Sequence, residues 1–466
     1  MAQIPIISGI YTDAGADFRI SYPTNLEPVI VDSGISKGYL RTVAGITGTS
    51  TGPGADRGGT LFKGKQYRVM GSSLCTVSDT GTIAVVGDVD FGGPVSFAQS
   101  FDLLAIASGG KLFYWDGSTV AQVTDPDLGL VIDVIWIDGF FMTTDGTSLV
   151  VTELNDPWSV DPLKYGSSEV SPDPVTGLLA LRGEVYALNR TTIENFRNSG
   201  SSGFPFVRQS GALIPKGCVG TFASAYILQT FAFIGGDVNE GVSVYLAGAG
   251  QAIPISTPEI DMELGRLTEE QLAAIEVESR RDRDEERLLI HLPSVTLVWL
   301  ANASKVSGEQ IWHRLAAGTG GDQPYLNRHA TLLNDRWWVG NPAGQLGYLD
   351  YGVETQFGAV AGWEFQTAFV YNESRGAIFK STELVGLPGR APFGVDATCF
   401  FAYTLDGQTW SEERANPMGQ RGERNIRMQW RPMFRMSNYA GFRFRGANTS
   451  MAAWARLEAD IEALSV

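Results

Sequence analysis

One short pattern recurs along this chain: an apolar strand, a glycine-containing turn, and a second apolar strand, often followed by Asp-Gly or Asn-Gly. The clearest copy is Leu103–Gly117, which reads LLAIASGGKLFYWDG. Each copy predicts a β-hairpin, because strand-forming residues flank a turn whose glycines accept a positive φ. Weaker copies occur at Tyr67–Val77, Phe140–Leu154, Leu179–Ile193, Phe231–Leu246, Leu288–Leu300 and Arg336–Asp350.

The spacing of these copies constrains the fold. About seven hairpins at intervals of about 35 to 55 residues are typical of four-stranded blades that repeat around an axis. We therefore predict an all-β chain in which residues 61–360 form a β-propeller. A closed ring leaves no sheet edge exposed, which favours a rigid structural component over a catalyst.

The segments on either side of the repeat differ from it in composition. Residues 1–60 are rich in turn-forming residues and include a Gly/Thr/Ser stretch at Thr47–Thr60, so we expect an irregular arm and a loop. Residues 361–466 alternate strand-like runs, such as Ala377–Leu384 and Thr398–Thr404, with loops. This pattern predicts a C-terminal β-sandwich.

One stretch within the repeat has helical signals. Thr268-Glu269-Glu270-Gln271 is a capping-box pattern and predicts a short helix near residues 268–280, through about Glu278. The run Arg280–Arg287 that follows is mixed in sign. It predicts either the solvated end of that helix or a face that docks a partner.

Charge and composition exclude several classes of protein. The 35 Lys and Arg against 51 Asp and Glu give a net charge of −16, which disfavours broad nucleic-acid binding. No window approaches the run of about 20 apolar residues that a membrane helix needs, and Met1–Pro5 does not begin a secretory signal. Cys75, Cys218 and Cys399 have no metal or disulfide spacing, so we expect buried thiols in a reducing cytoplasm.

Arginine is dense near the C-terminal end of the chain, where it is interleaved with aromatic residues. In Gly441–Gly446 the two types alternate, which places rings on one face of a strand and guanidinium groups on the other. Such a face suits phosphates or an acidic neighbouring subunit; the acidic charge of the chain favours a protein partner. The candidate interface residues are Arg424, Arg427, Arg431, Arg435, Arg443 and Arg445.

Two partial motifs lack residues that their chemistry requires. Gly59–Gln66 resembles a phosphate-binding loop, but Gln66 replaces the hydroxyl, and strand-like residues follow where a helix is needed. Asp88–Gly92 begins like a calcium loop, but Gln99 stands where the bidentate glutamate belongs. We predict neither nucleotide nor calcium binding.

Other candidate chemistry is equally incomplete. Leu405–Trp410 resembles the aspartate box of sialidase-type propellers but is one residue short of that spacing, so we interpret it as a turn. His291, His313 and His329 have no ligand spacing and indicate no triad. A carboxylate pair for glycoside hydrolysis is defined in space and not by sequence. We predict no catalytic residue, no cofactor and no metal.

Short segments spread over most of the chain form a recognisable series. They are Lys37–Arg41, Gly45–Thr47, Arg57–Gly59, Tyr67–Gly71, Cys218–Thr221, Val244–Leu246, Ile255–Ile260, Leu288–Pro293, Ile311–Trp312 and Thr404–Gly407, the last followed by an arginine-rich strand that contains Trp. In the same order, they resemble segments of the packaged-DNA stabilisation proteins, which are the tail hubs or tail accessory factors of short-tailed bacteriophages (podoviruses).

The resemblance implies a non-enzymatic component of the virion tail, assembled in the cytoplasm of the bacterial host. It implies a ring of six copies beneath the portal and its adaptor, which closes the DNA channel after packaging. The tail needle or plug and the tailspike or fibre proteins are the further partners that it implies, with packaged DNA held sterically. An alternative remains open: a glycan-binding or sialidase-like propeller that acts as a receptor-binding tail protein, in which Trp337 and Trp338 stack on sugars.

Overall fold

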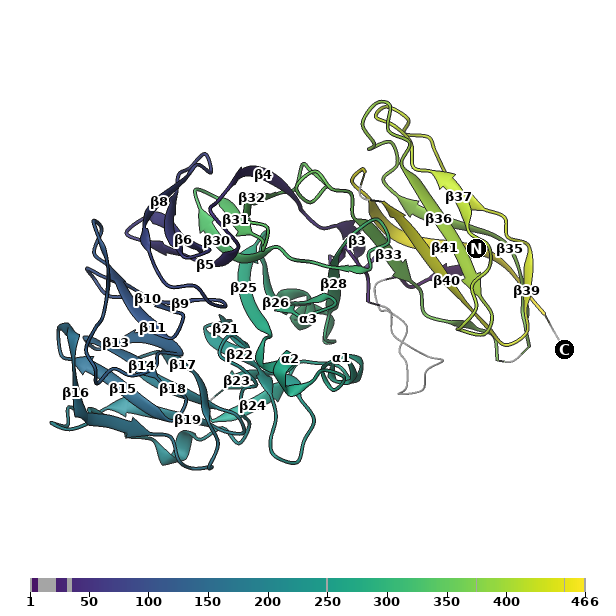
Figure 1. The fold of residues 1–466 in the computed structure, drawn as a ribbon. Coiled ribbons are helices and arrows are strands. Elements are labelled where there is room, and N and C mark those ends of the chain that lie inside the picture. Colours follow the sequence, from purple (N-terminus) through teal and green to yellow (C-terminus); the bar gives the residue numbers. More distant parts are fainter. Residues whose placement is uncertain are drawn as a thin grey trace. The chain divides into compact units, whose positions relative to one another are not determined.

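Antiparallel β-sheets make up most of the regular structure of this chain (Figure 1). The structure, a computed structural model, describes residues 2–6, 22–31, 36–248, 250–373, 375–447 and 449–464. The chain divides into two units, which we call the ring unit (Gly48–Arg280 and Leu326–Tyr348) and the sandwich unit (Met1–Thr47, Arg281–Tyr325 and Leu349–Val466).

Seven successive sheets of four or five strands occupy the repeat region in the described part of the chain. They contain β5 (Asp56–Phe62), β6 (Lys65–Met70), β7 (Ser73–Val77) and β8 (Ile83–Asp88); β9 (Ser96–Gln99), β10 (Leu104–Ser108), β11 (Lys111–Trp115) and β12 (Val120–Gln122); β13 (Asp133–Ile137), β14 (Phe140–Thr144), β15 (Ser148–Glu153) and β16 (Asp156–Ser167); β17 (Val175–Leu181), β18 (Glu184–Asn189), β19 (Ile193–Asn198) and β20 (Phe206–Arg208); β21 (Ser224–Ile227), β22 (Thr230–Gly235), β23 (Ser243–Gly248) and β24 (Gln251–Pro254); β25 (Glu276–Asp282), β26 (Glu285–His291), β27 (Thr296–Leu300), β28 (Trp312–Ala317) and β29 (Gln323–Pro324); and β30 (Arg328–Leu333), β31 (Arg336–Gly340), β32 (Gln345–Asp350) and β4 (Gly45–Thr51).

Each predicted hairpin is present as a pair of neighbouring strands. In the clearest copy, β10 pairs with β11 from Leu104↔Trp115 to Ser108↔Lys111. The turn between them is Gly109-Gly110, with φ values of +60° and +79°, which glycine adopts without a steric penalty. The hairpin prediction is confirmed.

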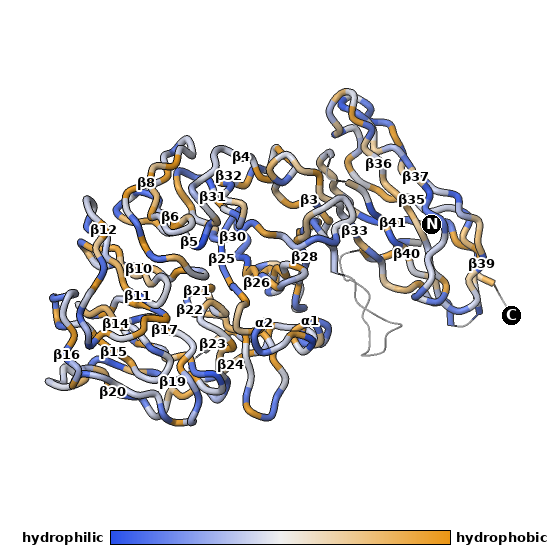
Figure 2. Tube along the Cα trace, in the orientation of Figure 1, coloured by the Kyte–Doolittle hydropathy of each residue, from blue (hydrophilic) through white to orange (hydrophobic). Residues whose placement is uncertain are grey.

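Alternation along each strand explains why the sheets pack face to face. Leu104 and Ile106 of β10 belong to a core shared with β5, β6 and β7. Ala105 and Ala107 of the same strand belong to the next core, with Val134 of β13 and other residues of that sheet. Successive side chains of a strand point to opposite faces, so a sheet covered on both faces needs apolar residues at every position. Figure 2 shows this hydrophobic run along β10.

The first strands of the seven sheets form a closed series within the ring unit. β5 contacts β9, β9 contacts β13, β13 contacts β17, and β30 contacts β5. Hydrogen bonds join the first strands that lie between β17 and β30 in this series. The Tyr226 hydroxyl on β21 donates to the Ala180 carbonyl on β17, and the Val277 N–H on β25 donates to the carbonyl of Phe222, which precedes β21. The Glu278 carboxylate on β25 accepts the Ala330 N–H on β30. The series therefore returns to its start, as in a β-propeller.

The last sheet takes its outer strand from the N-terminal part of the chain. Its order is β30-β31-β32-β4, so β4 closes the sheet begun about 300 residues later in the sequence. The Thr49 hydroxyl donates to the Leu346 carbonyl at 3.1 Å, and the Gly52 N–H donates to the Gly344 carbonyl at 2.8 Å. Hydrogen bonds between the two ends of the repeat close the propeller.

Besides β26, β27, β28 and β29 of the sixth propeller sheet, the sandwich unit contains two further sheets. One has the order β2 (Leu26–Val29), β3 (Tyr39–Thr42), β41 (Ala453–Ala463), β35 (Ala377–Gly386) and β38 (Met428–Trp430), with β1 (Ala2–Ile4) paired to β41 and β39 (Phe434–Met436) to β35. The other has the order β33 (Gly362–Gln366), β40 (Tyr439–Ala447), β36 (Thr398–Thr404) and β37 (Arg414–Pro417), with β34 (Val370–Tyr371) paired to β40.

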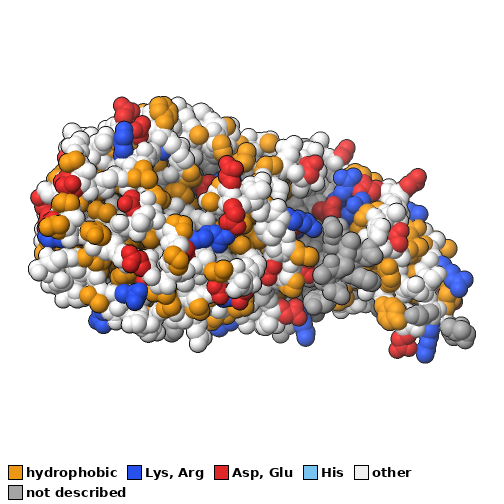
Figure 3. Space-filling view, turned by 60° about the horizontal axis from the view of Figure 1, so that its bottom comes forward, with side chains coloured by type: hydrophobic (Ala, Val, Ile, Leu, Met, Phe, Trp, Pro, Cys, Tyr) orange, Lys and Arg blue, Asp and Glu red, His pale blue; other side chains and the backbone are white. Residues whose placement is uncertain are grey.

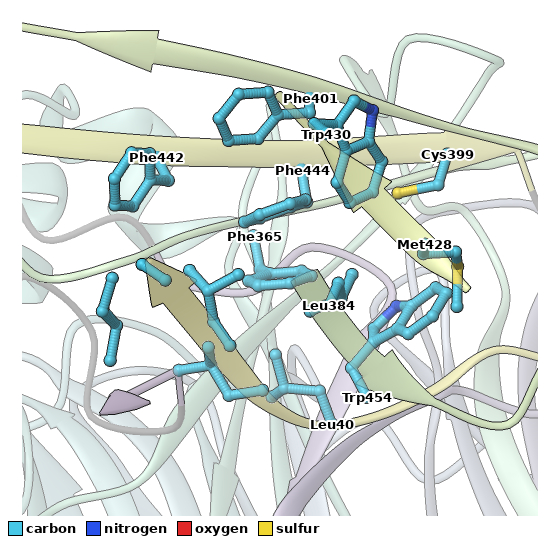
Figure 4. Packing of buried hydrophobic residues seen from close by; sticks show 14 of the residues in the cluster. Leu40, Phe365, Leu384, Cys399, Phe401, Met428, Trp430, Phe442, Phe444 and Trp454 are labelled. Atoms are coloured by element: carbon cyan, nitrogen blue, oxygen red, sulfur yellow. The ribbon is translucent and has the colours of Figure 1, made fainter. Parts of the chain in front are cut away.

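Aromatic side chains from both sheets fill the sandwich core. Phe365, Phe401, Phe442 and Phe444 are fully buried, and Figure 4 shows them grouped with Trp430 and Trp454. Phe365 and Phe444 stack with ring centroids 5.1 Å apart. The all-β prediction of a propeller followed by a sandwich is confirmed.

The N-terminal segment differs from the irregular arm that its composition predicts. β2 and β3 are strands of the sandwich and β4 is a strand of the propeller, because turn-forming residues can pair when a long-range partner strand is available. The division of the chain at residues 60 and 360 stays a prediction.

The helix prediction is partly wrong. The capping box is present: the Thr268 hydroxyl accepts the Gln271 N–H, and the Gln271 side chain accepts the Thr268 N–H. The helix, α2 (Glu269–Ala273), ends five residues earlier than predicted, and Arg280–Arg287 lies in the β25–β26 hairpin, with its turn at Arg283-Asp284.

The other helical segments are also short. They are α1 (Pro258–Leu264), α3 (Ala301–Ser307) and a 3₁₀ turn at Ser210–Ala212. Among the described residues, no helix has the length and apolar character required to cross a membrane.

Candidate interaction surface

The six candidate arginines lie on the sandwich unit. Arg424 and Arg427 precede β38, Arg431 lies between β38 and β39, and Arg435 is on β39; all four are exposed. On β40 the alternation places Phe442 and Phe444 in the core, each with 0% exposure, while Arg443 and Arg445 point away from it.

Three of the six arginines already have acidic partners within the chain. Arg445 donates from Nε and Nη2 to the two oxygens of Glu413, at 2.5 Å each, and Arg443 Nη2 lies 3.2 Å from Glu413 Oε1. Hydrogen bonding from Arg445 lowers the pKa of Glu413. Arg427 Nε donates to Glu383 Oε1 at 2.8 Å. The predicted arginine face is therefore partly neutralised by glutamates of the same sandwich.

A second group of arginines lines a cavity of the sandwich unit. Arg424, Arg390 and Arg421 share it with the carboxyl of Glu354, and its volume is about 820 Å³. Within the described residues, no acidic group forms an ion pair with these three guanidinium groups. We call this site the arginine cavity; its remaining lining residues are Gly352, Gly386, Leu387, Pro388, Gly389, Gly422 and Met451.

Two loops form the rim of the arginine cavity. The loop after β35 carries Arg390, and the loop before β38 carries Arg421 and Arg424. Of the three, only Arg424 is among the candidate interface residues predicted from the sequence; Arg421 belongs to the same arginine-dense run but is not among them, and Arg390 lies before that run. The available signal was the pairing of Gly and Arg in both loops, in PGRAPFG and GQRGER.

The ring unit contains a buried ionic cluster where three first strands meet. Arg68 of β6 donates from Nε to Asp56 Oδ1 at 2.8 Å, and both side chains are fully buried. The His329 ring joins Asp56 on β5 to Glu276 on β25, at 2.7 and 2.8 Å. Burial lowers the pKa of His329, but hydrogen bonds to Asp56 and Glu276 outweigh it and raise the pKa to about 9. This charged histidine links three neighbouring sheets.

The other candidate motifs from the sequence form parts of turns, strands or the core. Asp406 accepts the backbone N–H groups of Gln408 and Thr409, as a turn residue does. Trp338 is 1% exposed, which leaves it little surface for stacking on a sugar. The segment Tyr67–Met70 is part of β6, not a helix. The described residues contain no group of three or more His, Cys, Asp and Glu side chains placed to hold a metal ion.

The cysteines are buried free thiols. Burial raises the pKa of Cys75 and of Cys218 to about 11, and burial also raises the pKa of Cys399. These thiols therefore stay protonated at neutral pH. The thiolate is the nucleophilic form of cysteine, so the three residues are poorly suited to nucleophilic chemistry.

Comparison with known proteins gives matches over almost the whole chain. Residues 2–354 match the family described as "Bacteriophage P22 Gp10, beta-propeller", and residues 362–462 match "Bacteriophage P22 Gp10, beta-sandwich". The tail hub protein gp10 of Salmonella phage P22 is 31% identical over 337 residues, which cover 68% of this chain and 70% of that protein.

Solved structures resemble the chain more distantly. The Pan2 WD40 domain of Neurospora crassa has a TM-score of 0.44 and 10% identity, and covers 71% of this chain and 99% of its own. The N-terminal domain of Nup159 has a TM-score of 0.41 and 11% identity, with the same two coverages.

Proposed function

This chain belongs to the P22 Gp10 family, with its β-propeller and β-sandwich parts, and from that premise we propose that it closes the DNA channel of a short-tailed phage. As a tail hub it is a structural component of the virion tail. In the proposed role, six copies form a ring beneath the portal and its adaptor, retain the packaged genome, and carry the needle or plug and the spike or fibre proteins.

The observation that carries this proposal is the match of both family parts, in order, to residues 2–354 and 362–462. The fold supplies a physical reason. A propeller that is closed by β4 and cross-linked by buried ion pairs is a stiff body. Steric retention of DNA requires a stiff wall more than it requires affinity for DNA. The net charge of −16 disfavours adhesion of DNA.

The direct test is assembly onto DNA-filled heads that lack a tail hub. Adding the purified protein to such heads should protect the genome from nuclease, because the open channel becomes blocked. Electron microscopy of the same particles should show density beneath the portal. Heads that leak equally with and without the protein would contradict the proposed closure.

We also propose that the arginine face of β40, formed by Arg443 and Arg445, contacts acidic tail proteins. Because Arg443 and Arg445 share Glu413, exchanging the arginines alone would leave an unpaired carboxylate. The triple change Arg443→Gln, Arg445→Gln and Glu413→Gln avoids this.

We expect this triple variant to fold and to be incorporated into tails at least about 10-fold less often than the wild type, since charge-assisted contacts are strong at interfaces. The measurement is quantitative blotting of purified particles. The control is Glu412→Gln, an exposed change beside the site. Equal incorporation of wild type and triple variant would exclude these two arginines from the interface.

A further inference from the structure

We propose that the arginine cavity binds the carboxylates of an acidic protein segment. The inference rests on the proposed function for the source of that segment, which would be another tail protein. Binding to the cavity itself is a property of this chain alone and is measured separately.

The cavity brings together three arginines of the sandwich that form no ion pair with a described acidic group. Arg427, Arg443 and Arg445 are neutralised by Glu383 and Glu413. Arg390, Arg421 and Arg424 form no ion pair with any described acidic group, although the chain carries an excess of 16 negative charges. Figure 3 shows acidic and basic side chains interspersed over the face that it displays. Three guanidinium groups therefore share one hollow with a single acidic residue among the described lining residues, Glu354, whose pKa burial raises against the smaller, lowering effect of the charge of Arg421.

The backbone of the two rim loops is held in place without any ligand. The Gly389 N–H donates to the Met418 carbonyl at 2.9 Å, and the Arg421 N–H donates to the Ala391 carbonyl at 2.9 Å. Gly389 has φ of +72°, and a Cβ there would lie 2.7 Å from the Glu423 carbonyl oxygen. Only glycine permits this close approach. The arginines thus project from a preorganised support, which lowers the entropic cost of binding.

The chemistry of the lining favours carboxylates of a protein over phosphates of a nucleic acid. Guanidinium groups bind carboxylates and phosphates alike through two parallel hydrogen bonds, so the other lining residues must decide between the two ligands. No aromatic residue is among the described residues that line the cavity, so bases have no stacking surface. Glu354 also lies in the cavity and repels the dense charge of a phosphate backbone more than a few separate carboxylates.

The size of the cavity fits a peptide segment. Its volume of about 820 Å³ lies in the upper range of sites for ligands of drug size. One small anion would leave most of this space, and two of the three guanidinium groups, unused. A segment that presents two or three Asp or Glu side chains would engage all three.

The test uses the full-length protein and a fluorescently labelled hexaglutamate peptide, with binding measured by anisotropy at low salt. The variant Arg390→Gln/Arg421→Gln/Arg424→Gln removes the three cavity charges. The variant Arg414→Gln/Arg431→Gln/Arg435→Gln is the matched control: it removes three exposed charges of the same sandwich that lie outside the cavity and form no ion pair with a described acidic group. Both are checked for native melting, and Arg421→Gln alone serves if the cavity variant fails to fold.

We expect at least about 10-fold weaker binding for the cavity variant and less than about 2-fold for the control. Equal losses in the two variants would reduce the effect to net charge and overturn the inference. If a duplex oligonucleotide bound more tightly than the hexaglutamate peptide, and lost this binding in the cavity variant, the inference would be overturned in favour of a nucleic-acid ligand. Absence of peptide binding by the wild type would also overturn it, while nuclease protection of heads tests the hub proposal separately.

Discussion

Glu27 lies buried on β2 between two guanidinium groups of the sandwich unit. Arg287 donates to both of its oxygens, at 2.9 and 3.0 Å, and Arg41 donates to Oε1 at 2.7 Å. Burial raises the pKa of Glu27, but the charge of Arg287 outweighs it and lowers the pKa from 4.5 to about 2. Together with the His329 cluster of the ring unit, this network shows how single charged residues fasten strands that are distant in sequence.

Replacing Glu27 with Gln should destabilise the protein by about 3 to 5 kcal/mol, because Arg287, 1% exposed, loses its partner. In the wild type, the folded pKa is below the unfolded one. The stabilisation is therefore present above pH 4.5 and lost as the pH falls towards 2. Urea unfolding across this pH range measures both effects. Glu412→Gln, an exposed control, should change stability by no more than about 0.5 kcal/mol; an equal change in both variants would contradict the role of Glu27.

His329 makes the folding stability depend on pH in the opposite direction to Glu27. Its folded pKa, about 9, lies above the ordinary value of 6.5, so its stabilisation is complete below pH 6.5 and is lost as the pH rises through 9. His329 has φ of +58°, which Asn also tolerates. We expect His329→Asn to be less stable than the wild type at pH 6 and to approach it at pH 10. Parallel stability profiles would show that the histidine is not charged in the fold.

Each strand of the propeller is positioned by what covers its two faces. On β10, Leu104 and Ile106 enter one core and the alanines between and after them enter another, so one hairpin cannot bury its surface alone and needs a sheet on each side. At the start of β4, close approach of another backbone segment also restricts which residue fits. The Gly45 N–H donates to the Val353 carbonyl at 2.8 Å, and a Cβ on Gly45 would lie 2.3 Å from that oxygen.

Gly45→Ala should therefore destabilise the protein by about 1 to 3 kcal/mol or more, because the backbone must move to admit the methyl group. Thermal unfolding monitored by circular dichroism measures the change. Gly203, where a Cβ meets no atom within 4 Å, provides the control substitution Gly203→Ala. Comparable melting of the two variants would mean that β4 adapts to the methyl group at no cost.

At the scale of the whole molecule, the two ends of the chain are built into one sandwich core. Ile4, Leu26 and Leu40 belong to the same cluster as Trp363 and Trp454. Asn25, fully buried, donates to the Gly362 carbonyl. The sandwich is therefore not a self-contained C-terminal segment.

A fragment of residues 355–466 should lack fixed tertiary structure, because β2 and β3 and their share of the core are missing. Near-ultraviolet circular dichroism reports the packing of Trp363, Trp430 and Trp454. Fusing residues 22–47 to the end of the fragment through a flexible linker should restore part of the signal. A native-like spectrum of the unfused fragment would contradict the contribution of β2 and β3.

Local periodicity in the sequence determined the hairpins, the propeller class, the sandwich, and the opposed aromatic and arginine faces of β40. These features depend on neighbours one or two residues apart, and the sequence contains them directly. The family resemblance likewise needed only short segments in order. The start of α2 was predictable from its capping box, but its end was not, since β25 is drawn into a sheet by partners far along the chain.

Only the tertiary structure decided which segments meet across hundreds of residues. It assigned β4 to the last sheet of the propeller, gave β2 and β3 to the sandwich, and brought His329 between Asp56 and Glu276. It also separated the arginines that Glu383 and Glu413 neutralise from those of the arginine cavity. The physical reason is that pairing of distant strands and charges depends on packing and burial, which no local pattern encodes.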